Sequence, residues 1–149
     1  MTDVRQAAVT ALIDLARSPR WHDRADAGHG LASFTDVPAA RAVLLELVLD
    51  AGDTYVTRET AAALFRKGDT GALAVVSAAT ATAADAEQLD HVYDALCEVL
   101  GVYERDRDAA VATCRTLADD PDEHVRSGAE ALVAAMLAVE PALRSAESY

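Results

Sequence analysis

A pattern of apolar and small residues recurs along this chain, and it constrains the fold more than any other feature. Each copy has an apolar residue, then a polar one, then small residues and a closing aliphatic residue. The copies lie at residues 23–31, 56–64, 88–96 and 125–133, and their last residues are spaced by 33, 32 and 37. This period is typical of helical solenoids, in which each helix pair stacks on its neighbours to bury its apolar face.

Helical spacing and turn residues divide the chain into eight predicted helices. Gly68 follows Phe65-Arg66-Lys67 and Gly101 follows Val99-Leu100, so we expect both glycines to end helices in the left-handed conformation. Asp120 and Glu123 have the spacing of a capping box, which predicts a helix start there. The helices are expected at residues 3–17, 20–34, 37–49, 54–67, 70–80, 83–100, 105–118 and 121–138.

The composition agrees with an all-α fold. Of the 149 residues, 52% are hydrophobic but only 5% are aromatic, so small and aliphatic side chains carry the apolar content. Such side chains suit close helix packing, and there are too few turn residues for an all-β domain. We expect one domain over 1–149, with helical hairpins at about 1–35, 36–68, 69–102 and 103–139. The tail, 140–149, is expected to add a short helix or to fray.

Three segments resemble HEAT repeats of the short bacterial type: VRQAAVTAL from Val4, residues 50–69, and VRSGAEAL after Pro121. That family has an aspartate in the turn, then Val-Arg, spaced alanines and a leucine. The family's arginine position is occupied by Arg5, Arg24 and Arg126, whereas Thr57 and Leu89 replace it in the second and third hairpins. The resemblance implies a right-handed α-α superhelix, a HEAT-like solenoid, in which the second helix of each hairpin lines a concave, protein-binding surface.

Negative charge is concentrated in one part of the chain. The formal net charge is −12, and residues 83–123 hold twelve acids against three arginines. This balance disfavours nucleic acid and anionic membranes as partners, because both require Lys and Arg. It favours a protein or peptide partner that is basic. Alternatively, the acidic segment is a solvated face that keeps an alanine-rich protein in solution, since several of these acids are helix caps.

The predicted binding site lies on the helix at 83–100. Asp90, Tyr93, Asp94 and Cys97 are spaced by three and four residues, so they project from one side of that helix. A tyrosine among acids is a plausible binding element, because it supplies contact area at low entropic cost. The HEAT resemblance adds residues from the other second helices, each of which is also compatible with ordinary surface: His29, Glu59, Ala62, Arg66 and Glu130.

Three further features have a structural and a functional interpretation. The spacing of His22, Asp26 and His29 places them on one stripe of a helix, where they form either a metal site or a polar flank; we expect no metal and no cofactor. Trp21 is expected to be a packing residue or a hydrophobic staple. Both cysteines, Cys97 and Cys114, are expected to be buried, reduced thiols.

The sequence contains none of the motifs that indicate catalysis, so we expect a protein that is not an enzyme. It has no Gly-rich phosphate loop, no GxSxG and no HExxH. The HEAT-like hydroxylases use His-Glu pairs as iron ligands, and this chain has only the reverse order, Glu123-His124. The HEAT-like DNA glycosylases present a basic concave face, whereas this chain is acidic.

The favoured interpretation is a protein-protein interaction module, an adaptor or scaffold. One alternative is an acidic immunity-type inhibitor of a basic effector such as a nuclease. Another is an accessory enzyme or lyase-like chaperone that uses Tyr93 and nearby acids. The N-terminus lacks the pattern of a signal peptide, and the longest apolar run, 131–139, is about half a membrane span. A cytoplasmic location is therefore expected, and the oligomeric state stays open.

Overall fold

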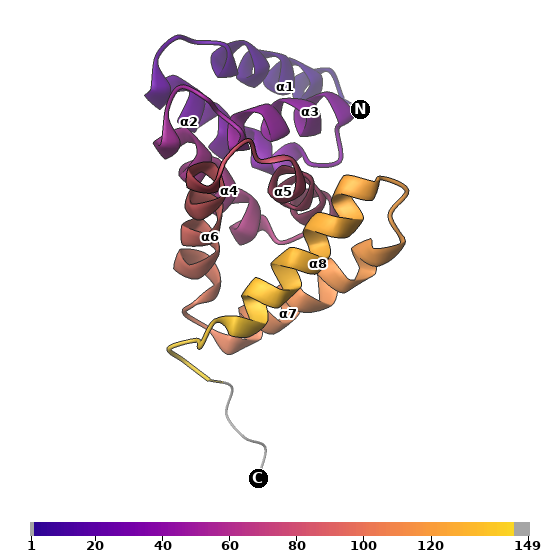
Figure 1. Cartoon of the computed structure of the whole chain (residues 1–149). Helices are drawn as coiled ribbons and strands as arrows, with labels where there is room; N and C mark the ends of the chain where they lie inside the picture. Colours follow the sequence, from indigo (N-terminus) through magenta and orange to yellow (C-terminus); the bar gives the residue numbers. More distant parts are fainter. Residues whose placement is uncertain (1, 145–149) are drawn as a thin grey trace.

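The computed structural model describes residues 2–144, and this part of the chain forms eight α-helices that follow one another as four consecutive pairs (Figure 1). The all-α fold predicted from the sequence is therefore confirmed. The helices are α1 (Asp3–Ala16), α2 (Trp21–Leu31), α3 (Pro38–Val48), α4 (Thr54–Lys67), α5 (Thr70–Thr82), α6 (Ala86–Leu100), α7 (Glu104–Thr116) and α8 (Glu123–Ala138). Short 3-10 turns, Ala32–Phe34 and Leu117–Asp119, extend α2 and α7.

Aspartates start most of the later helices. Asp53, Asp69, Asp85 and Asp122 precede α4, α5, α6 and α8, and each accepts a hydrogen bond from a backbone N–H of the first turn. The predicted capping box at Asp120 is wrong, because α8 begins two residues later than that motif requires. Asp120 instead accepts the N–H of Asp122 at 2.9 Å, and this bond orients the residue that caps the helix.

The two glycines that follow helices behave differently. Gly68 has a φ of 64°, so it ends α4 in the left-handed conformation, as predicted. Gly101 has a φ of −85° and a ψ of 0°, so the same prediction is wrong there. A β-carbon at position 101 would overlap the carbonyl oxygen of Cys97. The need for a glycine here is therefore explained by this close approach and not by a positive φ.

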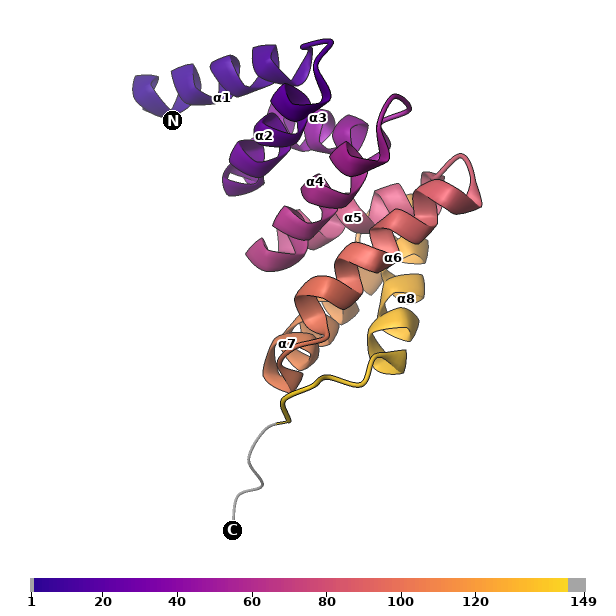
Figure 2. The same ribbon diagram turned by 90° about the vertical axis from the view of Figure 1, so that its left-hand side faces the viewer.

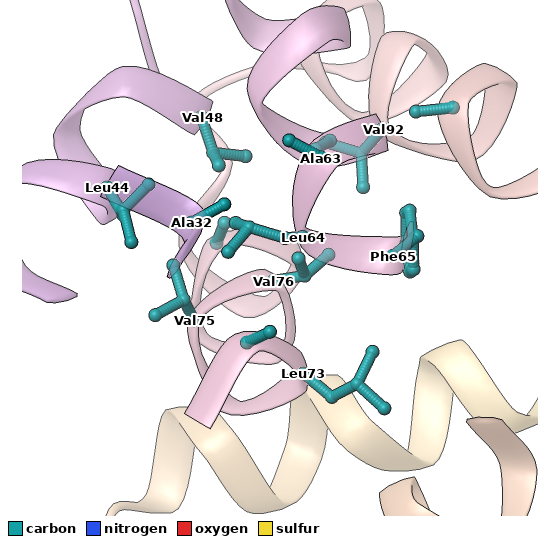
Figure 3. Packing of buried hydrophobic residues seen from close by; sticks show 14 of the residues in the cluster. Ala32, Leu44, Val48, Ala63, Leu64, Phe65, Leu73, Val75, Val76 and Val92 are labelled. Carbon is teal, nitrogen blue, oxygen red and sulfur yellow. The ribbon is translucent and has the colours of Figure 1, made fainter. Parts of the chain in front are cut away.

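Helices α2, α4 and α6 pack in one layer, and α1, α3 and α5 pack behind them in a second. In the first layer, Gly28 of α2 lies against the side chain of Thr60 of α4, where a β-carbon would not fit. Figure 3 shows the centre of the core, where Leu64 of α4 lies beside Val76 of α5 and both are fully buried. Small residues at the contacts thus let the layers close tightly.

The fourth helix pair does not continue this pattern. In a regular stack α8 would extend the first layer beyond α6, but here α8 packs chiefly on α5 of the second layer. Figures 1 and 2 show α7 and α8 lying together at the end of the molecule opposite α1. A β-carbon at Gly128 of α8 would overlap the carbonyl oxygen of Ser77 of α5, so the two backbones touch. As a consequence, none of the helices in residues 2–144 packs closely against one flank of α6.

The arginine position of the repeat has a clear structural role. The Nη1 group of Arg24 donates to the carbonyl oxygens of Ser18 and Pro19 at 3.2 and 3.0 Å. Arg126 occupies the matching place in α8, and its Nη1 donates to the carbonyls of Asp120 and Pro121 at 2.8 and 3.1 Å. Each arginine therefore ties its helix to the turn six and five residues before it.

The segment after α8 folds back along the turn between α6 and α7 (Figure 2). The N–H of Ala142 donates to Gly101 O at 2.9 Å, and the N–H of Leu143 donates to Val102 O at 2.8 Å. For residues 140–144 the expectation of a short helix or a frayed end is wrong, because the segment is not helical and these backbone bonds hold it against the turn. The rest of the tail, 145–149, lies outside the described residues. No described helix has the length and hydropathy needed to span a bilayer.

Candidate protein-binding groove

A mostly apolar groove of about 420 Å³ lies between α6 and α8. It exists because α8 packs on α5, which leaves the flank of α6 open. The segment after α8 contributes the last two of its lining residues. The lining residues are Tyr93, Leu96 and Cys97 of α6, Ala135 and Ala138 of α8, and Val139 and Glu140.

The packing of α8 explains the one wrong prediction among the thiols. Cys97 was expected to be buried, which would hold if α8 covered α6; it is exposed and lines the groove instead. Cys114 is buried between α7 and its neighbours, as predicted, and this burial raises the pKa of its thiol to about 11. The two cysteines therefore differ sharply in their access to solvent.

Two carboxylates stand on the same side of α6 as the groove. Asp90 and Asp94 are exposed; Asp90 precedes Tyr93 by three residues and Asp94 by four, so all three project from the same broad side of α6. Tyr93 is half-buried, so its ring packs against the core while part of it faces the groove. The groove thus combines an apolar surface with negative charge at its edge.

Arg66, another predicted site residue, belongs to the junction between α4 and α6. Its Nη2 lies 3.4 Å from a carboxylate oxygen of Glu98, and Arg58 reaches the other oxygen at 3.3 Å. All three side chains are more than 40% exposed, so these ion pairs contribute little to stability. Their effect is to neutralise Glu98, whereas Glu87, Asp90 and Asp94 of this helix have no ion pair within the described residues.

The remaining predicted site residues do not join the groove. His29 is exposed on α2 and Glu59 is half-buried on α4. Ala62 is only 1% exposed, so its predicted place at the groove is wrong; it faces the core. Glu130 lines a different hollow, between α7 and α8, together with Arg126. Because α8 packs chiefly on α5 and not on α6, Glu130 lies away from Tyr93.

The candidate metal stripe and the single tryptophan lie on the surface of α2. His22, Asp26 and His29 are all exposed, and no group of three potential metal ligands is assembled anywhere in residues 2–144. Trp21 packs edge-to-face on Tyr55, with ring centroids 5.0 Å apart. It remains 46% exposed, so it is a surface packing residue and not part of the core.

Sequence reasoning missed the half of the groove that α8 provides. The long apolar run at 131–139 contains Ala135, Ala138 and Val139. It has more apolar residues than the buried face of α8 can hold. Only Leu132 and Met136 of this run are fully buried, and Leu137 is 53% exposed. An apolar stripe broader than one face was therefore the available signal for a second surface.

Comparisons with family models and with curated proteins give no match. Among solved structures, the chain is similar to an engineered protein determined by the Northeast Structural Genomics Consortium. The two share 20% identity with a TM-score of 0.43, over 96% of this chain and 67% of the other.

Proposed function

We propose that this protein is a HEAT-like binding module, an adaptor or scaffold that holds a basic protein or peptide segment in the groove between α6 and α8. The observation that carries the proposal is the groove itself, which has apolar residues from two helices and the carboxyl group of Glu140 in its lining, with Asp90 and Asp94 exposed on the same helix as Tyr93. Such a site would bind a partner and would not catalyse a reaction. Its walls are built on helices packed into the core, so little ordering accompanies binding.

Tyr93 is the residue we expect to contribute most to affinity. Its ring is held against the core on one side and faces the groove on the other. A tyrosine in this position offers a large apolar contact and a hydroxyl for a hydrogen bond, with few rotatable bonds to fix. Leu96 and Ala135 extend the apolar surface beside it. A partner side chain of moderate size, such as leucine, fits this lining.

The charge of the site favours a partner that carries Lys or Arg beside its apolar anchor. Asp90 and Asp94 lie in the most acidic part of the chain, and Glu140 adds a carboxyl group at the groove. Exposed charges of one sign accelerate association with an oppositely charged partner and disfavour acidic competitors. The rate of association is therefore expected to fall as salt is added, because exposed charges are screened.

The assignment to a HEAT-like repeat is supported by the repeated arginine. Arg24 and Arg126 make matching contacts with the carbonyls of the preceding turn, although they lie in different layers of the stack. The same residue type at the same place in two helix pairs is what a shared repeat unit would produce. This supports a common structural unit, and the binding role follows from the groove and not from the unit.

Cys97 allows a direct test of the proposal, because it is an exposed thiol inside the groove. A benzophenone maleimide attached to Cys97 would be irradiated in extract of the source organism, and the cross-linked peptides identified by mass spectrometry. We expect a defined segment rich in Lys and Arg. The matched control carries the label at Asp14→Cys in a Cys97→Ser background, because Asp14 is exposed on the distant α1.

The captured protein would then be purified and its affinity measured at increasing salt. We expect the double variant Asp90→Asn with Asp94→Asn to bind more weakly and with a smaller salt dependence. Asp14→Asn, which removes an acid far from the groove, should leave binding unchanged. The proposal fails if both label positions capture the same segment, or if the double variant binds like the original protein.

A further inference from the structure

A second and larger hollow lies on the other layer of the molecule, with a volume of about 740 Å³. Its floor is α5, and its two sides are α3 and the first turns of α8, which both pack on α5. The apolar lining consists of Ala42 and Leu45 of α3, Ala74, Val75 and Ala78 of α5, and Val125 of α8. The hollow shares no lining residue with the groove between α6 and α8.

Helix α5 is the central helix of the fold. One narrow strip of its surface is left partly uncovered by other helices, and this strip forms the floor of the hollow. Most of its residues are buried, from Ala72 and Leu73 through Ala79. Ala74 is half-buried and lies on the open strip, one turn after Gly71. A β-carbon at Gly71 would lie 2.9 Å from the carbonyl oxygen of Thr35, so this end of the floor is closed. Small side chains on the floor allow a partner to approach the α5 backbone closely.

Carboxylates outnumber bases around this hollow. Asp36, Asp69, Asp120 and Asp122 line it, against Arg41. Asp36 is bound by Arg5, and Asp69 accepts the N–H of Ala72 and the hydroxyl of Thr35. At the α8 side, Asp120 and Asp122 each use only Oδ1 in hydrogen bonds within the described residues. The Oδ2 atoms of this pair remain available to donors from outside.

We infer that this trough, defined by α3, α5 and the start of α8, is a second docking surface and that its partner is a basic amphipathic helix. A floor of small residues between two helices accepts a third helix by ridge-into-groove packing. The apolar face of the partner would cover Ala74 and Leu45. Its Lys or Arg residues would reach Asp120 and Asp122, which line the trough and whose Oδ2 atoms make no hydrogen bond within the described residues. This inference does not depend on the groove that contains Tyr93.

The test uses a phage-displayed library of helices about fourteen residues long, a length near the minimum for an isolated helix. One library has Ala, Leu, Ile or Val on one face and Lys or Arg on the other; a second has Asp or Glu in place of the bases. We expect enrichment only from the basic library. A selected peptide would be synthesised with a fluorescein label, and its dissociation constant measured by anisotropy.

Two variants locate the bound peptide. Asp120→Asn with Asp122→Asn removes the rim charges and keeps a side chain that caps α8 as well as aspartate does. We expect roughly threefold to thirtyfold weaker binding from the loss of two exposed pairs. Ala74→Phe fills the trough from its floor and should abolish binding. The matched control, Asp53→Asn with Asp85→Asn, removes two cap charges elsewhere and should bind like the original protein.

Folding of every variant is checked by its thermal unfolding midpoint, so that a loss of binding is not confused with a loss of structure. The inference is overturned if the acidic library enriches equally, if the basic library does not enrich, or if Ala74→Phe binds the peptide unchanged. It is also overturned if Tyr93→Ala, and not Ala74→Phe, removes binding. That result would place the peptide in the groove between α6 and α8.

Discussion

Gly128 of α8 lies directly against the backbone carbonyl of Ser77 of α5. This contact places α8 in the second layer, and the side chain of Ser77 beneath it is fully buried. Both candidate binding surfaces border α8, one at its first turn and the other at its last. The close approach of these two residues is therefore the packing feature on which the candidate binding surfaces depend.

Replacing Gly128 by alanine should destabilise the protein by about 2 kcal/mol or more, because the backbone of α5 must move to admit the β-carbon. This loss should exceed the gain of about 1 kcal/mol in helix propensity. Urea unfolding monitored by circular dichroism measures the difference. The matched control is Gly30→Ala, whose β-carbon would lie 2.7 Å from the movable side-chain end of Leu12. Equal stability of both variants would contradict the packing of α8 on α5.

The ion pair between Arg24 and Asp50 should not tolerate the conservative substitution of arginine by lysine. The guanidinium donates to both carboxylate oxygens, at 2.9 and 3.2 Å, and both side chains are mostly buried. Lysine cannot make this paired contact and also reach the carbonyls of Ser18 and Pro19. We expect Arg24→Lys to lower the free energy of unfolding by about 1–2 kcal/mol. Arg58→Lys, at an exposed pair, should change it far less, and a similar loss at both positions would argue against this role.

The ion pair between Arg5 and Asp36 predicts how the stability of the folded protein depends on pH in the acid range. Two hydrogen bonds of 2.6 Å from Arg5 lower the pKa of Asp36 from 3.8 to about 2. Because the folded pKa is depressed, the stabilisation is complete above pH 4 and is lost as pH falls toward 2. The thermal midpoints of the original protein and of Asp36→Asn should therefore differ at pH 6 and converge near pH 2. A difference that persists unchanged at pH 2 would contradict the assigned pair.

The two thiols should react at very different rates. At pH 8, Cys97 is exposed and should be modified quickly by a disulfide reagent, whereas Cys114 is buried and its pKa is raised to about 11. We expect one thiol per chain to react in the native protein and the second only after denaturation. The Cys97→Ser variant identifies which thiol is which. Rapid reaction of that variant would show that the packing of α7 on its neighbouring helices does not shield Cys114.

The local features of the fold could be predicted from the sequence because they depend on neighbouring residues. Period and turn residues located all eight helices, and α4 was predicted with both of its observed ends, Thr54 and Lys67. Asp90, Tyr93 and Asp94 were placed on one side of α6 for the same reason. Spacing along one helix determines these relationships, and no long-range contact is needed to infer them.

The position of α8 could not be predicted in this way, because periodicity shows that a helix has an apolar face but not which helix will cover it. The last copy of the repeat, ending at Val133, follows the third by 37 residues and not by 32 or 33. That longer interval was a sign of irregular stacking. Gly128 and Ser77 are small residues at the contact between α8 and α5. They lie far apart in the sequence, so periodicity along one helix does not predict that they meet. The wrong prediction of a buried Cys97 and the separation of Glu130 from Tyr93 both follow from this contact.

The affinity of the partner captured through Cys97, measured with Tyr93→Ala, tests the role of the groove most directly. If the groove between α6 and α8 is the binding site, this variant should bind the partner roughly tenfold or more weakly, since a central tyrosine contributes strongly to an interface. Asp14→Asn should bind with the affinity of the original protein. An unchanged dissociation constant for Tyr93→Ala, with its thermal midpoint also unchanged, would contradict the proposed function.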